Sequence, residues 1–144
     1  MIFLDTNIWT YATIVQDPLK RRLAQKIIKT ALTRDDFVIS TQVISECANT
    51  LFRRGNKKMA DVLGVVHWME SLPYVVNITP AIVKRAIEIK TLYGISFYDA
   101  QIIATAENSG CEYIISEDLS STQTYADIAC INPFINTPQW LIDR

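Results

Sequence analysis

Residues 96–118 read SFYDAQIIATAENSGCEYIISED, a helix-forming run that leads into a short apolar run. Ser96 is a typical N-cap residue, and Ser109-Gly110 is a typical helix end. The apolar residues Tyr113-Ile114-Ile115 that follow suit a strand covered on both faces. We therefore predict a helix that begins at Ser96, then a buried strand, and then the polar stretch Ser116-Glu117-Asp118 directly after that strand.

The same alternation extends along the rest of the chain. The other expected strands are the apolar runs Ile2–Leu4, Phe37–Ile39, Tyr74–Val76 and Ile128–Ile131. The other expected helices run from Leu19 to Leu32, from Ser40 or Thr41 to Arg54-Gly55, from Lys57 to Leu72, and from Thr79-Pro80 to Gly94. Alternating strands and helices predict an α/β fold with a largely parallel sheet and right-handed crossovers. The tail, residues 132–144, is expected to be irregular or briefly helical and to fold back.

Composition indicates one globular domain. The chain has 144 residues, of which 49% are apolar and 20% charged, and it has no internal repeat or linker, so we expect a single domain over residues 1–144. Its apolar runs are far shorter than the roughly 20 residues of a membrane span. Because the start of the sequence lacks the basic and apolar regions of a signal peptide, we expect a cytoplasmic protein without membrane association.

Several classes of site are excluded by the residue inventory. The cysteines Cys47, Cys111 and Cys130 are odd in number and widely spaced, which favours reduced, packed thiols over disulfides or a zinc site. His67 is the single histidine, so catalytic triads that need histidine and metal motifs with paired histidines are excluded. The four glycines form neither a dinucleotide-binding motif nor a P-loop.

The charge balance does not mark a nucleic-acid binder, because the net charge is −1. A protein of this charge that binds RNA would need local positive charge or bound metal ions. There are two local basic clusters, Lys20-Arg21-Arg22 and Arg53-Arg54 with Lys57-Lys58. Each cluster taken alone is also what a solvated helix face or helix end looks like.

Two acidic residues follow predicted strands. Asp5 comes directly after the first strand, and Asp118 follows the strand of residues 113–115. The carboxyl ends of parallel strands meet at one edge of a sheet, where ligands usually bind. The alternatives are local: Asp5 could cap the next helix, and Asp118 could be a turn residue.

Two further acidic residues lie on predicted helices. Asp99 shares the apolar face of its helix with Tyr98 and Ile102, and burying a carboxylate there is costly unless it is paired. The alternative is a capping box in which Ser96 is the N-cap and Asp99 stands three residues later. Glu46 falls on the polar side of its helix, which by itself indicates a solvated side chain.

These acids together, Asp5, Glu46, Asp99 and Asp118, would form a site for metal ions. Several carboxylates in one pocket need compensating charge, and oxygen ligands select hard cations such as Mg²⁺ or Mn²⁺. Such ions activate water and stabilise the oxygens that attack and leave in phosphodiester hydrolysis. A metal-loaded pocket would also allow a nearly neutral protein to bind a polyanion.

The motifs around these acids resemble those of PIN-domain nucleases. In chain order, the matching segments are Ile2-Phe3-Leu4-Asp5-Thr6-Asn7, Val43-Ile44-Ser45-Glu46, residues 96–106 around Asp99, Tyr113-Ile114-Ile115-Ser116-Glu117-Asp118, and Ile131-Asn132-Pro133-Phe134. They occur in the family's order across nearly the whole chain. The single departure from the pattern is Ser116 in place of the commoner threonine, which keeps the hydroxyl.

The resemblance implies a three-layer α/β/α fold and metal-dependent cleavage of RNA by an activated water. Asp5 and Asp99 would be direct ligands of Mg²⁺ or Mn²⁺, and Glu46 and Asp118 would complete the site, partly through waters. Residues that would orient these ligands are Asn7, Ser45, Ser116 and Glu117.

A chain of this size resembles the VapC-type toxins of bacterial toxin–antitoxin pairs. That resemblance implies a cognate antitoxin in the acidic groove and a homodimer, with Arg53, Arg54, Lys57 and Lys58 lining an RNA groove or binding the antitoxin. A non-catalytic PIN-like module that binds RNA or protein is the main alternative, and loss of an acid would mark it. A phosphatase of the haloacid dehalogenase type would need aspartate where Asn7 stands, and a receiver domain would need an acidic pair and a late lysine.

Overall fold

A central sheet with the strand order β3-β2-β1-β4-β6-β5 organises the computed structural model, which describes residues 1–14 and 16–143. The strands are β1 (Ile2–Leu4), β2 (Phe37–Ser40), β3 (Val75–Val76), β4 (Tyr113–Ile115), β5 (Thr124–Tyr125) and β6 (Ile128–Ile131). Neighbouring strands are parallel except β5, which pairs with β6 in antiparallel orientation. The predicted α/β fold with a mainly parallel sheet is confirmed.

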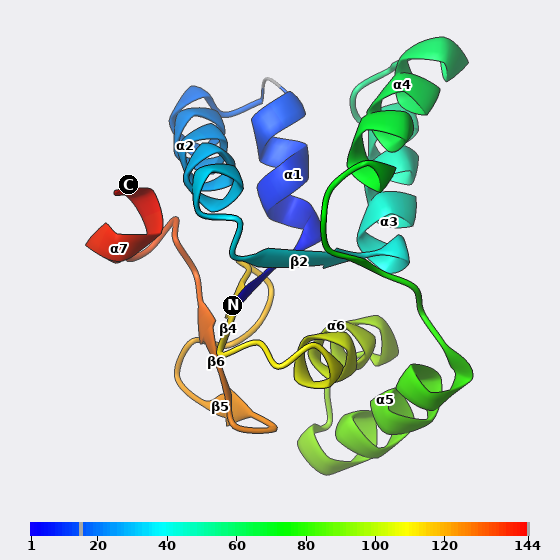
Figure 1. Cartoon of the computed structure of the whole chain (residues 1–144), viewed down its shortest axis with the longest axis vertical. Coiled ribbons are helices and arrows are strands. Elements are labelled where there is room, and N and C mark those ends of the chain that lie inside the picture. The colour runs from blue at the N-terminus through cyan, green and yellow to red at the C-terminus, as the bar shows by residue number, and fades with distance from the viewer. Residues whose placement is uncertain (15, 144) are drawn as a thin grey trace.

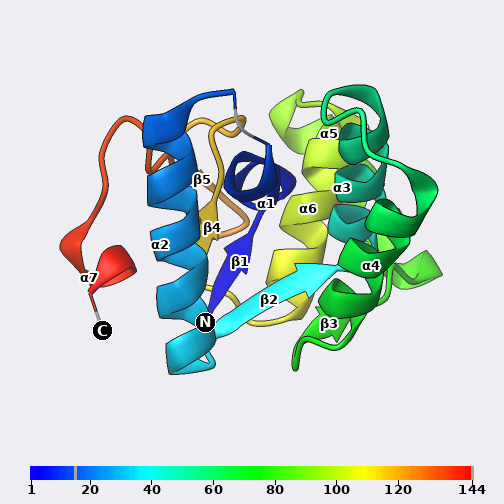
Figure 2. The same ribbon diagram turned by 90° about the horizontal axis from the view of Figure 1, so that it is seen from above.

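Helices cover both faces of this sheet. They are α1 (Thr6–Thr13), α2 (Pro18–Arg34), α3 (Thr41–Arg53), α4 (Met59–Glu70), α5 (Pro80–Tyr93), α6 (Phe97–Asn108) and α7 (Gln139–Ile142). Figure 1 shows α1 and α2 on one side of the strands and α5 and α6 on the other. The turned view in Figure 2 shows α3 and α4 side by side beyond the end of β2. This is the expected three-layer arrangement.

Local side chains explain where the helices begin. The hydroxyls of Ser40, Thr79 and Ser96 each accept a hydrogen bond from a backbone N–H in the first turn of α3, α5 and α6. Gly94 ends α5 with a φ of 67°, a left-handed conformation that glycine adopts without strain. These boundaries agree with those predicted from the sequence, although α4 begins two residues later than expected.

One strand was missed. β5 is two residues long, and of its residues Thr124 is exposed and only Tyr125 is buried. A short antiparallel edge strand of this kind does not produce the continuous apolar run that marked the parallel strands.

The core lies where β1, β2 and β4 meet the helices. Phe3, Leu4 and Ile114 are fully buried, as is Ile103 of α6. The tail folds back as predicted, since α7 packs on α2 and Leu141 is buried; Arg144 lies outside the described residues.

The structure also shows the state of the cysteines and the position of the single histidine. Cys47, Cys111 and Cys130 are unpaired and buried, as expected. His67 lies on the surface of α4 and hydrogen-bonds Glu70. Among residues 1–14 and 16–143, none of the helices combines the length and the apolar composition that crossing a membrane requires.

Candidate active site

A cavity of about 440 Å³ opens between α1, α3 and α6, at the carboxyl ends of β1 and β4. The four acids singled out from the sequence all line it: Asp5, Glu46, Asp99 and Asp118. They come from the end of β1, from α3, from the first turn of α6 and from the loop after β4. The fold therefore brings together carboxylates that lie up to 113 positions apart in the sequence, from residue 5 to residue 118.

Asp5 is the most deeply buried of the four and is only 4% exposed. It caps α1, where Oδ1 accepts a hydrogen bond from the Thr6 backbone N–H at 2.7 Å, while Oδ2 accepts one from the Ser116 hydroxyl at 2.7 Å. The pKa of Asp5 is raised from its ordinary 3.8 to about 7, mainly by burial and in smaller part by the charges of Glu46 and Asp118, which together outweigh the lowering effect of these two hydrogen bonds. Asp5 is thus a helix cap and a cavity residue at once.

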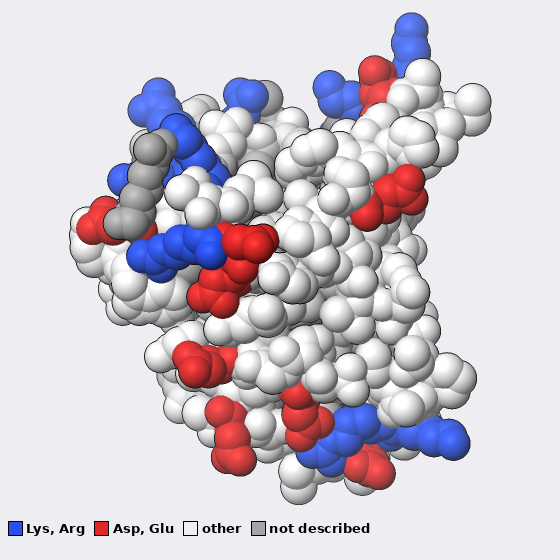
Figure 3. Space-filling view, viewed as in Figure 1, with Lys and Arg blue, Asp and Glu red and all other residues white. Residues whose placement is uncertain are grey.

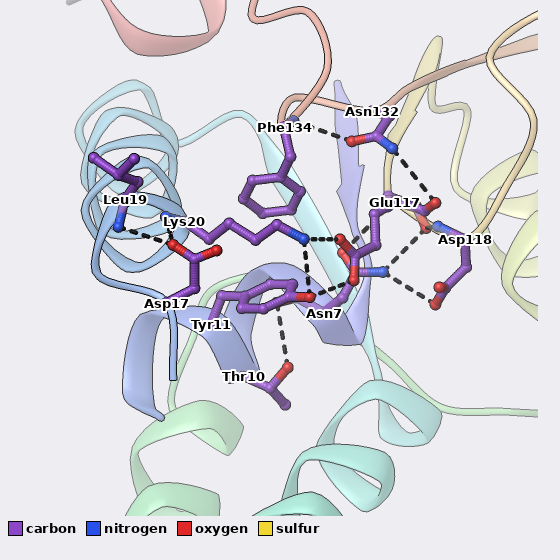
Figure 4. A network of polar contacts seen from close by, with 11 residues as sticks. Asn7, Thr10, Tyr11, Asp17, Leu19, Lys20, Glu117, Asp118, Asn132 and Phe134 are labelled. Atoms are coloured by element: carbon purple, nitrogen blue, oxygen red, sulfur yellow. Dashed lines mark hydrogen bonds and ion pairs between the residues drawn. The ribbon is translucent and has the colours of Figure 1, made fainter. Parts of the chain in front are cut away.

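Ser116 joins Asp5 to Asp118 across the end of the sheet. Its Oγ accepts hydrogen bonds from Asn7 Nδ2 at 3.2 Å and from the Asp118 backbone N–H at 3.0 Å. Asn7 Nδ2 also donates to Asp118 Oδ2 at 3.2 Å, as Figure 4 shows. The Ser116 hydroxyl therefore contacts both the Asp5 carboxylate and the backbone of Asp118.

Glu46 faces the cavity together with the other three acids, whereas the helix pattern alone indicated a solvated side chain. Thr6 Oγ1 donates to its Oε2 at 2.5 Å, and Gln42 Nε2 donates to its Oε1 at 3.0 Å. The polar side of α3 was mistaken for a solvent-facing side because a helix pattern alone does not distinguish water from a polar cavity.

A buried pair of glutamines holds α3 against α6. Gln42, only 7% exposed, donates to the Tyr98 carbonyl oxygen at 3.0 Å and accepts from Gln101 Nε2 at 2.7 Å. Gln42 and Gln101 were not predicted from the sequence. The available signal was spacing, since Gln42 stands one helical turn before Glu46 on the same face.

Asp99 is half-buried at the start of α6. Burial raises its pKa, the nearby charges of Asp118 and Glu46 raise it further, and Ser96 lowers it. The Ser96 hydroxyl also accepts a hydrogen bond from the Asp99 backbone N–H at 3.2 Å, so Ser96 does cap the helix. Tyr98 was expected on the apolar face but is 63% exposed, because it belongs to the first turn of α6, at the edge of the cavity.

The other predicted residues are distributed more widely. Arg53 and Arg54 line the same cavity as the acids, whereas Lys57 lines a neighbouring cavity of about 670 Å³ between α1, α3 and α4. Lys58 and Ser45 are exposed and line neither; Ser45 precedes Glu46 by one step of roughly 100° around the helix and so projects away from the acids. On the face in Figure 3, Lys and Arg form separate groups with Asp and Glu between them.

The residues around the cavity have the chemistry of a site for a hard cation. Within the described part of the chain, its lining offers carboxylate, amide and hydroxyl oxygens but no histidine or cysteine. Asp5, Glu46 and Asp118 accept hydrogen bonds from neighbouring groups. No three of the carboxylates among the described residues stand close enough to hold an ion directly. An Mg²⁺ ion that uses one or two carboxylates and retains several waters fits such an arrangement.

Comparison with known families gives the identity of this fold. The family model described as PIN domain matches residues 2–125. The chain belongs to the PIN domain family. The resemblance found in the sequence motifs is thereby confirmed, whereas a comparison with curated proteins gave no match.

Solved structures share this PIN fold. The toxin VapC20 of Mycobacterium tuberculosis matches with a TM-score of 0.67 and 20% identity, covering 90% of this chain and 99% of VapC20. A chain of VapBC2 from Rickettsia felis, solved with promoter DNA, matches with a TM-score of 0.67 and 15% identity over 91% of this chain and 98% of its own. A chain of the FitAB complex with DNA matches with a TM-score of 0.64 and 23% identity, covering 93% and 96%. At these identities the likeness shows the fold.

Proposed function

We propose that this PIN domain is an endoribonuclease that depends on Mg²⁺ or Mn²⁺. The observation that carries the proposal is the gathering of Asp5, Glu46, Asp99 and Asp118 around one cavity whose lining suits a hard cation. The raised pKa values of Asp5 and Asp99 support it, because they reflect burial of the two carboxyl groups and, in smaller part, the negative charges of the neighbouring acids, both of which a bound cation would offset.

Each acid has a role in this proposal. Asp5 and Asp99 are the direct ligands, and Glu46 and Asp118 complete the site partly through waters. A bound divalent ion supplies a water of lowered pKa and stabilises the charge that develops on the phosphodiester. Ser116 and Asn7 hold the carboxylates of Asp5 and Asp118 in fixed positions through their hydrogen bonds.

The substrate side of the site is supplied by helix α3. Arg53 and Arg54 line the cavity that holds the acids, and in this proposal their guanidinium groups would bind the phosphates of an RNA strand whose scissile bond lies at the acids. Lys57 and Lys58 lie directly before α4 and outside this cavity, where they would line a further part of the RNA groove or bind the antitoxin.

We further propose that the protein is the toxin of a type II toxin–antitoxin pair. VapC20 is described as a toxin that cleaves the sarcin-ricin loop, and VapBC2 and FitAB are complexes with promoter or other DNA. By this likeness the chain would act as a single cytoplasmic domain over residues 1–144, form a homodimer, and be silenced by a cognate antitoxin that covers the acidic cavity.

Cleavage of a mixed RNA pool tests the enzymatic proposal. Purified protein is expected to cut RNA with Mg²⁺ or Mn²⁺ present. EDTA is expected to reduce the cleavage rate to background, because the proposed reaction needs a water activated by the metal ion. Cleavage that persists at full rate in EDTA would contradict metal dependence. Folded, antitoxin-free protein that binds RNA without cutting it under either metal would instead support the non-catalytic binding module.

Ser116→Ala is expected to weaken metal binding by ~10–100-fold, the usual effect of losing a group that orients a ligand. The change removes a donor to Asp5 and the acceptor shared by Asn7 and Asp118. Calorimetric titration with Mn²⁺ measures the affinity directly. Ser116→Thr, which keeps the hydroxyl, is the matched control and should bind Mn²⁺ nearly as the wild type does. Equal affinity in the alanine variant would remove Ser116 from the site.

A further inference from the structure

Glu117 lines the same cavity as Asp118, yet its carboxylate is bound by groups outside the four acids. Tyr11 OH donates to Glu117 Oε1 at 2.6 Å, and Lys20 Nζ donates to Oε2 at 2.9 Å. Lys20 Nζ also donates to Tyr11 OH at 3.2 Å. Each carboxylate oxygen of Glu117 therefore has its own donor, one from α1 and one from α2, as Figure 4 shows.

Aromatic rings hold the lysine in place. Lys20 Nζ lies 4.7 Å from the centroid of the Tyr11 ring and 5.0 Å from that of Phe134, distances at which the ring faces attract a cation. The two rings meet edge to face with their centroids 5.0 Å apart. We call Tyr11, Lys20, Glu117 and Phe134 the Glu117 cluster; it joins α1, α2, the loop after β4 and the segment after β6.

The backbone of Glu117 is tied to the same region. Its N–H donates to Asn7 Oδ1 at 3.4 Å, and its carbonyl oxygen accepts from Asn132 Nδ2 at 3.5 Å. Asn7 is also the residue whose Nδ2 donates to the Asp118 carboxylate. A displacement of Glu117 would therefore be transmitted to Asn7 and Asp118 together.

We propose that Tyr11 and Lys20 are positioning residues, which act through Glu117 to hold Asp118 and Asn7 in place for a divalent cation. The ion pair with Lys20 also keeps the Glu117 carboxylate from coordinating that cation. This inference rests on the proposed metal-dependent function. It gives the two adjacent acids different roles. The Glu117 carboxylate is paired with an ammonium group, whereas the Asp118 carboxylate accepts a hydrogen bond from a neutral amide and stays available to a cation.

The ion pair contributes little to the stability of the fold. The side chains of Lys20 and Glu117 are 33% and 23% exposed, and pairs of this kind are typically worth ~0–1 kcal/mol. A purely structural role would therefore produce only a small change in melting temperature. A positioning role would instead change the affinity for the metal. Melting temperature and metal affinity together therefore distinguish a structural role from a positioning role.

Two charge-preserving changes test the inference by calorimetric titration with Mn²⁺ alone. Tyr11→Phe removes one donor to Glu117 and keeps the ring, and the double variant K20M/E117Q removes the ion pair without changing the net charge. We expect each to weaken the Mn²⁺ affinity ~10-fold, with melting temperatures near that of the wild type. RNA cleavage should fall at limiting Mn²⁺ and recover at saturating Mn²⁺. Lys26→Met, an exposed change on the same helix α2, is the control and should match the wild type.

The outcomes are distinguishable. Wild type that binds no Mn²⁺, or binds it no better than Asp5→Asn does, would overturn the proposed metal site and this inference with it. Wild-type binding that is lost in Asp5→Asn but unchanged in both cluster variants would overturn this inference alone. A raised KM for RNA at unchanged Mn²⁺ affinity would also overturn it, because Lys20 would then act on the substrate.

Discussion

Asp5→Asn is expected to lower RNA cleavage by at least ~10³-fold, equivalent to about 4 kcal/mol of lost transition-state stabilisation. Asp5 is the buried carboxylate at the end of β1, and Asn removes its charge while keeping nearly the same shape. Cleavage rates at saturating Mg²⁺ and Mn²⁺ measure the effect. A variant that cuts RNA at the wild-type rate would show that the proposed site is wrong.

The same substitution should stabilise the metal-free protein at high pH. The pKa of Asp5 is raised to about 7 by burial, so between about pH 4 and 7 the folded state binds more protons than the unfolded state. Wild-type stability from this group is therefore greatest in acid and is lost as the pH rises through 7. About three pKa units at about 1.4 kcal/mol each correspond to roughly 4 kcal/mol. Asn does not titrate, but it also weakens the hydrogen bonds that Asp5 accepts from Thr6 and Ser116, so we expect a net gain of about 2 kcal/mol at pH 8.

Denaturant unfolding in EDTA at pH 5 and pH 8 measures whether the stability of the wild type falls as the pH rises. The wild type should lose stability between the two values more steeply than Asp5→Asn. An equal loss in both proteins would mean that Asp5 does not titrate in this range. A variant destabilised equally at both pH values would show that the bonds from Thr6 and Ser116 outweigh the buried charge.

Features governed by neighbouring residues were predictable from the sequence. The starts of α3, α5 and α6 follow from single hydroxyl residues, and the positions of Asp5 and Asp118 follow from the ends of two apolar strands. Each of these helix starts and acid positions can be predicted from a few consecutive residues. The gathering of Asp5 and Asp118 at one edge follows from the parallel direction of β1 and β4.

Features governed by distant contacts were not predictable in the same way. The helix pattern assigned Glu46 to solvent because it cannot show that α3 presents its polar side to a cavity. Lys20 looked like part of a solvated basic run, and only the fold shows that it reaches Glu117. Nothing local to Tyr11 or Phe134 signals that their rings meet around one ammonium group.

Asp99→Asn is expected to lower cleavage by ~10²-fold or more while leaving the fold nearly as stable as the wild type. The hydrogen bond that caps α6 runs from the Asp99 backbone N–H to the Ser96 hydroxyl, so the change of side chain keeps it. The substitution removes a half-buried carboxylate whose pKa is raised by burial and by the charges of Asp118 and Glu46. Cleavage assays and thermal melts must therefore be run on the same preparations.

Ser96→Ala is the matched comparison because it removes the cap and leaves the carboxylate. It should cost ~1 kcal/mol of stability, as loss of an N-cap usually does, with most of the cleavage retained. If Asp99→Asn stayed active and lost only stability, Asp99 would be a helix-capping residue and not a ligand. The opposite pair of results, an inactive but stable Asp99→Asn beside an active but weakened Ser96→Ala, would assign capping to the serine and metal binding to the carboxylate three residues later.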